Sequence, residues 1–513
     1  ASVIGRDFTL EALVNLASLS VETVQEGLDS LCEAGLVHRR RGQQFVMFEF
    51  KHALVRDAAY ESLLRERRRT LHSRFAANAK SDANPELVAF HYTEAREWRA
   101  GATSWIEAGT NAARKSAHRE ALEHFHNALA CLEMLDDDNE PLTLSCTIDL
   151  AFGYRNLGQP DDVIRTLAEI DDLIARAGGP EEQAKVHYLR GVAFFVLGEV
   201  DKTFEEEQAA LAAAREANSP EFEARALSSL GDAAYASKRV HSANEYQREC
   251  AELAKVHGLT QVAIDNATCF EATHRHISGT ADPQYVVESI ELAVDANLLR
   301  AESILCAGAA WTFAHRNEVE RSLEFAERGT RAAHMAGSEL WHTYCLSAQA
   351  RTLTLLGRQH EGYELAQACV QSARATGSAI VGGLAFGAMA ISANDADELL
   401  EVLDEGVRQL KDGDAAHCHV DFYRDAIDAC LNKALWQQAL RFVRLLREFN
   451  SLEPLQPAEF MAARGELLAR VGLGERGPSF VEEAQRLITE GRTLGLTYFV
   501  SALSDVIDLA LDT

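Results

Sequence analysis

Residues that could carry chemistry are few and scattered along this chain of 513 residues. His417, Cys418 and His419 form the densest group of metal-ligating side chains, because imidazole and thiolate both suit zinc. Consecutive residues on a helix point in different directions and do not converge on one ion, so we predict no metal site. The ten cysteines include no CxxC pair, which is typical of a protein of the reducing cytoplasm.

Nucleotide-binding and catalytic motifs are also missing from the sequence. The P-loop pattern GxxxxGK[ST] does not occur, and the stretch from Gly472 to Gly477 lacks the lysine and hydroxyl residue that hold phosphate and Mg²⁺. The chain contains no HExxH zinc motif and no convincing nucleophile elbow. We therefore expect this chain to be non-catalytic and to hold no cofactor itself.

Three aromatic residues in the middle of the chain suit ligand binding. Trp311, Trp341 and Tyr344 fall on stretches of helical periodicity. Stacked helical repeats form extended concave surfaces, so these side chains are candidates for lining a ligand or peptide groove. The alternative is that they belong to the hydrophobic core.

The densest basic run consists of Arg65, Arg67, Arg68 and Arg69. One interpretation is a docking surface for an acidic partner domain. The alternative is a solvated helix face with no partner.

The overall charge is strongly acidic. Fifty Lys and Arg residues stand against 78 Asp and Glu residues, a formal net charge of −28. Binding to nucleic acid or to an anionic membrane requires clustered positive charge, so we expect neither partner. The most apolar stretch, 379–393, is shorter than the 18 residues that a membrane span needs, and we predict a buried helix there. A cytoplasmic location follows from these features.

Helix-ending residues recur with a period of about 40 residues. Glycine and asparagine tolerate the left-handed conformation that ends helices, so a regular series of them predicts repeated helix ends. One series is Gly178, Asn218, Gly258, Asn297, Gly337 and Gly377. A second series, offset by half a period, is Gly158, Gly198, Lys238, Ser278, Asn317 and Gly357. Two interlocked series with one period predict a helix-turn-helix solenoid.

Small residues inside these units resemble those of tetratricopeptide repeats (TPR). The stretch SWIEAGTNAARKSAHREALEHFHNALACL places Gly109, Ala121, Phe125 and Ala128 in the expected phase. The period exceeds the 34 residues typical of that family, so we expect longer helices. The prediction is an all-α, TPR-like superhelix of about ten units over residues 81–513.

Residues 1–80 do not share this period and are predicted to form a winged-helix domain. A helical stretch, 9–17, precedes Ser20, a favourable N-cap for a second helix that ends at Gly35. The segment VHRRRGQQFVMFEF then predicts a β-hairpin. The helix that would enter the DNA major groove offers four carboxylates and no basic residue, which argues against DNA binding. These carboxylates are Glu22, Glu26, Asp29 and Glu33.

The amino-acid sequence of this N-terminal region resembles that of one known module. ASVIGRDFTLEAL, GLDSLCEAGLVHRRR and FEFKHALVRDAAYESLLRERRRTLHSRFA are similar to the winged-helix segment after the ATPase core of bacterial STAND signalling ATPases. The likeness is greatest to those linked to class III adenylate or guanylate cyclases and to maltose-activator-like regulators. It covers about the first 130 residues. It implies a bound ATP or ADP in a longer protein, whose ATPase domain would be a partner of this chain in the same polypeptide.

The same resemblance gives His52 a role. In related plant resistance proteins a Met-His-Asp motif occupies this strand-to-helix junction, and its histidine reaches the β-phosphate of ADP. Lys51 and Ala53 replace the methionine and aspartate, so one residue of three matches. The resemblance therefore makes His52 a candidate nucleotide sensor, and the alternative is that its side chain satisfies a helix N-terminus.

The function we expect is that of a non-catalytic sensor. The superhelix would bind an effector, a protein or a small molecule, and restrain the nucleotide switch through a population shift. The alternative is a free-standing TPR scaffold for protein–protein interaction. Self-association is compatible with both.

Overall fold

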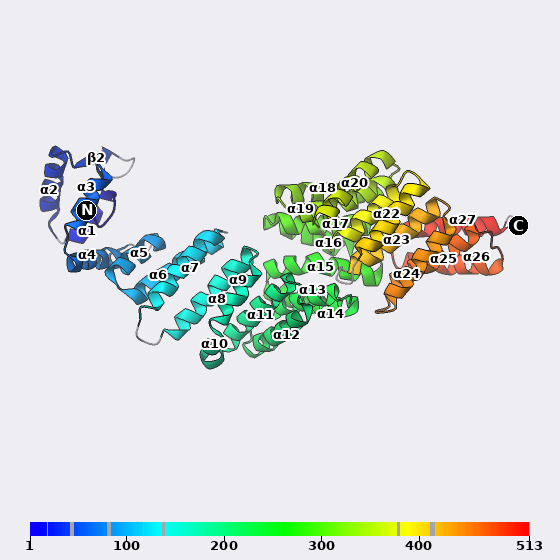
Figure 1. Cartoon of the computed structure of the whole chain (residues 1–513), viewed down its shortest axis with the longest axis horizontal. Coiled ribbons are helices and arrows are strands. Elements are labelled where there is room, and N and C mark those ends of the chain that lie inside the picture. The colour runs from blue at the N-terminus through cyan, green and yellow to red at the C-terminus, as the bar shows by residue number, and fades with distance from the viewer. Residues whose placement is uncertain are drawn as a thin grey trace. The chain divides into compact units, whose positions relative to one another are not determined.

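The computed structural model describes residues 1–17, 19–41, 46–79, 84–115, 117–135, 139–376, 380–410 and 416–511. The chain divides into two compact units, Ala1–Leu197 and Gly198–Thr513. Helices dominate both units (Figure 1), which confirms the predicted α-solenoid. The domain boundary expected near residue 80 falls inside the first unit and stays a prediction.

A three-stranded antiparallel sheet opens the first unit. Strand β3 (Val46–Phe50) lies between β1 (Asp7–Thr9) and β2 (Val37–Arg41). Phe8 lies opposite Phe48 in the β1–β3 pair, and both side chains are at most 2% exposed. The β2–β3 pairing confirms the hairpin predicted from the two apolar runs.

Three helices pack with this sheet, namely α1 (Leu10–Ala17), α2 (Val21–Glu33) and α3 (Ala53–Glu61). The Ser20 hydroxyl accepts a hydrogen bond from the Thr23 amide at 3.2 Å, so the predicted N-cap of α2 is confirmed. Gly35 follows the end of α2 with φ +68°, a conformation in which glycine has no Cβ penalty. Leu28 of α2 is 1% exposed and anchors the helix to the sheet.

Eight further helices complete the first unit. They are α4 (Arg65–Ala77), α5 (Pro85–Ala95), α6 (Trp98–Arg114), α7 (His118–Leu132), α8 (Glu140–Asn156), α9 (Pro160–Ala168), α10 (Asp171–Ala177) and α11 (Pro180–Val196). Close packing between α6 and α7 depends on Gly109, because a Cβ there would lie 2.6 Å from the Phe125 ring. Ala121 and Ala128 are fully buried in the same contact. The predicted phase of small residues is therefore confirmed for this pair.

The second unit consists of further antiparallel helices, arranged in successive pairs. They are α12 (Val200–Glu216), α13 (Pro220–Ala236), α14 (Val240–His257), α15 (Thr260–Ser278), α16 (Pro283–Asp295), α17 (Leu299–His315), α18 (Val319–Met335), α19 (Glu339–Leu355), α20 (Gln359–Thr376), α21 (Gly382–Ser392), α22 (Ala396–Gln409), α23 (Ala416–Asn432), α24 (Trp436–Asn450), α25 (Gln456–Gly472), α26 (Pro478–Thr493) and α27 (Ser501–Leu511), with a 3-10 turn η1 (Thr497–Val500) before α27.

Most of the predicted helix ends adopt the left-handed conformation. Positive φ values occur at Gly158, Gly198, Asn218, Lys238, Gly258, Asn297, Asn317, Gly337 and Gly357. Gly178 ends α10 as predicted, but with φ −75° and not in the left-handed conformation. The prediction at Ser278 was wrong by one residue, because Ser278 is the last residue of α15 and Gly279 takes the left-handed position at φ +90°. Gly377 lies outside the described residues. Ala434 has φ +54°, which continues the series where the sequence lacks glycine.

Each helix pair of the second unit begins with an odd-numbered helix, which we call a first helix. Six of these first helices form a closed ring. Helices α15, α17, α19, α21, α23 and α25 contact one another in sequence, and α15 also contacts α25. Helices α17 and α23 are consequently surrounded, and each buries 14 of its 17 residues. The inner side of this unit is therefore packed interior.

None of the helices in the described ranges is long and apolar enough to cross a bilayer. The apolar stretch that the sequence analysis singled out contains α21, where Leu384, Phe386 and Ala388 are at most 1% exposed. The predicted buried helix is thus confirmed.

Candidate functional site

His52 lies at the junction between β3 and α3, as the sequence suggested. It occupies the N-cap position of α3 with extended backbone angles, and its side chain makes no capping hydrogen bond. The residue is exposed. The helix N-terminus therefore does not account for this imidazole, and its role as a nucleotide sensor stays a prediction.

The arginine run forms the start of α4. Arg65 and Arg67 are exposed, whereas Arg68 and Arg69 are half-buried. Arg68 lies 4.9 Å from the centre of the Tyr60 ring and 3.4 Å from the Glu61 carboxylate. Only part of the predicted docking surface thus faces solvent.

Two leucines near this run in the sequence are also exposed. Leu54 in the first turn of α3 is 80% exposed, and Leu64, next to Arg65 in the chain, is 81% exposed. An exposed leucine adjoining an exposed arginine is suited to a protein partner.

The predicted aromatic groove is not an open surface. Trp341 and Tyr344 of α19 contact each other edge to face, with ring centres 5.7 Å apart, and Tyr344 also contacts the His417 ring. Trp311 of α17 is 1% exposed and lies in the interior. The structure therefore places Trp311 among core side chains, because the ring of first helices closes over it.

Trp311 lies within a dense group of charged side chains inside the second unit. The Arg351 and Arg424 guanidinium carbons each lie 5.1 Å from its ring centre, and that of Arg275 lies 5.9 Å away. Cation–π attraction of this kind strengthens when the groups are desolvated. We call this group the interior cluster. Its members, each at most 4% exposed, are Glu271, Arg275, His276, Trp311, His315, Arg351, Asp421, Arg424 and Asp425.

Ion pairs and one hydrogen bond connect four helices through the interior cluster. Asp421 of α23 lies 2.6 Å from Arg424 Nη1 and 3.6 Å from Arg275 Nη1 of α15. Asp425 accepts hydrogen bonds from Arg424 Nε at 2.9 Å and from Arg351 Nε of α19 at 3.1 Å. His315 of α17 contacts Arg424 Nη1 at 3.2 Å. Helix α23 therefore meets three other first helices through charged side chains.

Burial and neighbouring charge act together on these groups. Burial alone would raise the pKa of Asp421, but the guanidinium groups of Arg424 and Arg275 hold that pKa well below its usual range. Burial followed by the Arg275 charge lowers the pKa of His276 to about 3. Burial and Arg424 likewise lower the pKa of His315. These two histidines are neutral at pH 7, so the cluster's charges are those of its arginines and carboxylates.

Some polar atoms of the cluster have no partner within the described part of the chain. They include Arg275 Nη2, Arg424 Nη2, His276 Nε2 and Asp421 Oδ2. A cavity of about 20 Å³ lies beside these four residues. That volume accommodates about one water molecule, so a larger ligand requires rearrangement.

The His417–Cys418–His419 group does not have the geometry of a metal site. His417 hydrogen-bonds through Nδ1 to Tyr235 Oη at 3.2 Å and through Nε2 to the Ile380 carbonyl at 2.8 Å. His419 stacks on Phe449 with ring centres 4.9 Å apart. Both ring nitrogens of His417 are thus engaged within the protein, and the two histidines make separate contacts.

A different trio offers metal-ligating atoms in the first unit. Glu86, Glu120 and His124 place one such atom each within 4.8 Å of one another. Both glutamates are exposed, and His124 stacks on Trp105. Exposed carboxylates often lie this close with no ion between them, and we assign no site here.

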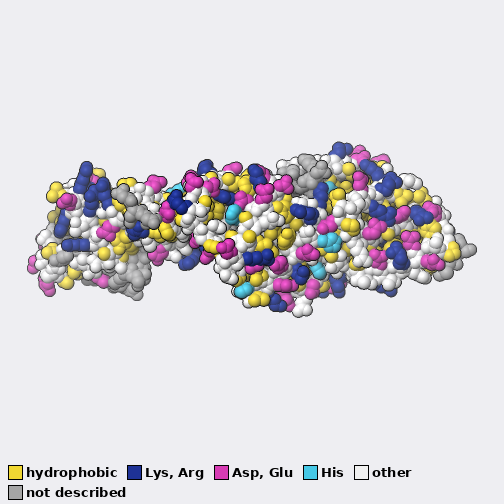
Figure 2. Space-filling view, turned by 90° about the horizontal axis from the view of Figure 1, so that it is seen from below, with side chains coloured by type: hydrophobic (Ala, Val, Ile, Leu, Met, Phe, Trp, Pro, Cys, Tyr) yellow, Lys and Arg dark blue, Asp and Glu magenta, His cyan; other side chains and the backbone are white. Residues whose placement is uncertain are grey.

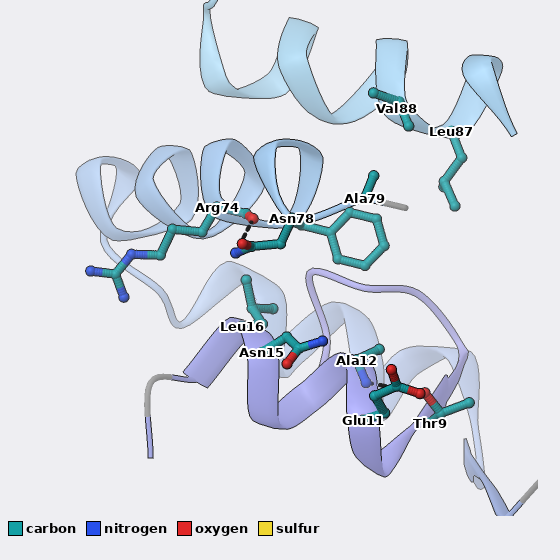
Figure 3. Close-up of a pocket in the computed structure, with 11 residues that line it drawn as sticks. Thr9, Glu11, Ala12, Asn15, Leu16, Arg74, Asn78, Ala79, Leu87 and Val88 are labelled. Atoms are coloured by element: carbon teal, nitrogen blue, oxygen red, sulfur yellow. Dashed lines mark hydrogen bonds between the residues drawn. The ribbon is translucent and has the colours of Figure 1, made fainter. Parts of the chain in front are cut away.

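A pocket between α1, α4 and α5 measures about 260 Å³ (Figure 3). It is lined by Asn15 and Leu16 of α1, by Phe75 of α4 and by Leu87 of α5. Asn78, the C-cap of α4, also lines it and donates a side-chain hydrogen bond to the Arg74 carbonyl. None of the residues predicted from the sequence lines this pocket, and its volume is below that of typical ligand sites.

Apart from Trp311, the interior cluster was not predicted from the sequence. A signal was present in α23, where Asp421, Asp425 and Asp428 recur at helical spacing in a largely apolar segment. On the face shown in Figure 2, acidic and basic side chains are interspersed over the C-terminal part of the chain.

Comparisons with known proteins support the fold. No protein-family model matches the chain. A protein of Rhizobium meliloti (strain 1021) described as uncharacterized is 26% identical over 197 residues, and the match covers 36% of this chain but 19% of that protein.

The solved structures that resemble the chain include the following two. A Rap protein complexed with Competence and Sporulation Factor has a TM-score of 0.52 and 11% identity, covering 68% of this chain and 98% of that one. A STAND protein (Signal Transduction ATPase with Numerous Domains) with a tetratricopeptide repeat sensor from Pyrococcus horikoshii has a TM-score of 0.52 and 14% identity. That match covers 87% of this chain and 64% of that one. The fold of this chain is therefore an all-α, TPR-like superhelix.

Proposed function

We propose that this chain is the non-catalytic sensor region of a STAND-type signalling ATPase in the cytoplasm. In this proposal residues 1–80 form a winged-helix domain, and the superhelix binds a protein effector and restrains the nucleotide switch. The likeness to the STAND protein with a repeat sensor supports it, because that likeness extends over 87% of this chain. The ATPase domain of a longer polypeptide would supply the ATP or ADP site.

His52 would contact the nucleotide in that longer protein. Its exposed side chain at the start of α3 has no capping role and is free to donate a hydrogen bond to a phosphate oxygen. Arg65 and Arg67, with Leu64 next to Arg65 in the chain, would form the exposed part of the surface that docks on the ATPase domain.

The test uses the product of the complete reading frame. We expect His52→Ala to lose bound ADP during gel filtration, whereas His38→Ala retains it, because His38 is exposed on β2 of the same domain and has no proposed role. ADP content would be measured by chromatography of the denatured protein. Equal ADP retention by both variants would refute the sensor role of His52.

The alternative function is a free-standing TPR scaffold that gathers protein partners. The match to the Rap protein, which covers 98% of that chain, favours the scaffold about as strongly as the match to the STAND protein favours the sensor. Sequencing upstream of Ala1 separates the two. A P-loop and an acidic metal-binding strand within roughly 250 residues, the length of one or two domains, would support the signalling ATPase. A start codon at Ala1 would support the scaffold.

A further inference from the structure

Helix α23 carries an acidic stripe that faces arginines on three other helices. Asp421, Asp425 and Asp428 follow one another at i, i+4 and i+7, so they share one face of the helix. Asp421 pairs with Arg275 of α15, and Asp425 pairs with Arg351 of α19. Asp428 pairs with Arg464 of α25 at 2.5 Å. The pairs with Arg275 and Arg351 connect segments 146 and 74 residues apart, so they bridge the interior of the ring of first helices.

Buried ion pairs stabilise a protein interior no better than apolar side chains do. Removing charged groups from water costs more than their attraction returns in many buried pairs, and apolar side chains of similar size would stabilise the fold at least as well. The sequential neighbours of α23 already use apolar contacts, such as Phe422 against Phe442 of α24. Two of the three aspartates therefore contact helices across the ring, and Asp428 contacts the neighbouring α25.

The surface that receives α23 is cationic and aromatic. Arg275 and Arg351 flank Trp311, while His276 and His315 beside them are held neutral by burial and neighbouring arginines. Glu271 pairs with Arg275 at 3.3 Å and is the acidic member of the cluster outside α23. Two guanidinium groups and one carboxylate leave this surface with excess positive charge, which complements the carboxylates of α23.

Hydrogen-bonding capacity remains on this surface with α23 in place. Arg275 Nη2 and His276 Nε2 have no hydrogen-bond partner in the part of the chain that the structure describes. Both residues are at most 4% exposed and border the cavity of about 20 Å³. His276 Nδ1 donates to the Ala272 carbonyl, so Nε2 of the neutral ring is an acceptor. The unpaired Arg275 Nη2 donor favours any ligand that brings an additional acceptor oxygen.

We propose that α23 is the internal occupant of a recognition site for an acidic helical segment of a partner protein. The partner segment would carry carboxylates one helical turn apart and would replace Asp421 and Asp425 on Arg275 and Arg351. Release of α23 would break its packing against α21 and α24 and the contacts of His417 with Tyr235 and Tyr344. This inference rests on the proposed sensor function and names the chemistry of the effector.

The experiment uses a labelled peptide of residues 416–432 as the probe and the complete 513-residue chain carrying D421N and D425N. The substitutions weaken the internal occupant while keeping its shape. By fluorescence anisotropy we expect the acidic peptide to bind this chain at least ten-fold more tightly than a peptide with Asn at all three Asp positions. Adding R351Q should weaken binding at least ten-fold, whereas R358Q, at an exposed arginine five residues beyond the last buried residue of α19, should not.

Equal binding of both peptides, or no effect of R351Q, would overturn the proposal. If the doubly substituted chain does not fold, hydrogen exchange of the wild-type chain replaces it. Excess acidic peptide should then accelerate exchange of α23 amides and the Asn peptide should not, and identical exchange with the two peptides would be the contrary result. A negative outcome leaves the proposed function standing, since ADP retention by His52 variants does not involve the interior cluster.

Discussion

Acid should destabilise the second unit through His276. Its pKa is about 3 in the folded chain, because burial disfavours the charged imidazole and Arg275 adds repulsion, while Asp421 and His417 face it as well. The ordinary value is about 6.5. A depressed histidine pKa means that the unfolded chain binds more protons between about pH 3 and 6.5, so stability falls as the pH drops through that window. Between pH 7 and pH 5 the loss from His276 alone is about 2 kcal/mol.

The perturbation is His276→Gln, and the assay is urea unfolding followed by circular dichroism at pH 7 and pH 5. Between pH 7 and pH 5 the free energy of unfolding of the variant should fall by about 2 kcal/mol less than that of the wild type, whatever the variant's stability at pH 7. Asp421 does not contribute over this interval, because its pKa is lower still, and His315 and His417 remain in both proteins.

The matched control is His360→Gln, since the His360 side chain is 84% exposed. It should reproduce the pH dependence of the wild type. If His276→Gln also keeps the full wild-type pH dependence, then His276 is not held neutral by its surroundings and the reasoning is refuted.

Three further predictions concern packing and burial. Asp232→Asn should stabilise the chain by up to about 3 kcal/mol at pH 7. Burial raises the pKa of Asp232 in the folded chain to about 6. Stability that is present below the unfolded pKa is therefore lost as the pH rises through 6. At pH 4 the substitution should give no such gain in urea unfolding. Gly109→Ala should cost about 1–3 kcal/mol through collision with Phe125, whereas Gly27→Ala, with open space around the new methyl group, should be neutral or stabilising in thermal unfolding. Trp311→Leu should cost about 3 kcal/mol or more by the same measurement, and a cost below about 1 kcal/mol would contradict its placement in the core.

Features set by local chemistry were predictable from the sequence. Asn218, Gly258 and Asn297 adopt positive φ because helix termination depends on the residue at that position and its immediate neighbours. Ser20 caps α2 for the same reason. The error at Ser278 amounts to one residue, since Gly279 next to it can adopt the left-handed conformation without a Cβ penalty.

The interior cluster was not predictable in the same way. Contact between Arg275 and Asp421 depends on how far the stack of helices rotates over five first helices, and that curvature accumulates from small rotations between neighbours. A sequence pattern indicates that Trp311 lies on a helix but not that the ring closes over it. Of the candidate groove residues Trp311, Trp341 and Tyr344, Trp311 is therefore packed in the interior, whereas Trp341 is partly exposed.

The closed ring also bears on how the second unit unfolds. Open solenoids unfold by fraying, because each repeat contacts only its neighbours and stability is a sum of adjacent terms. Here the hydroxyl of Tyr235 contacts His417, 182 residues later, and the backbone amide of His241 donates to the Glu453 carboxylate, 212 residues later. Such distant contacts couple early and late repeats into one cooperative transition, and they slow folding, since long loops must close before the contacts form.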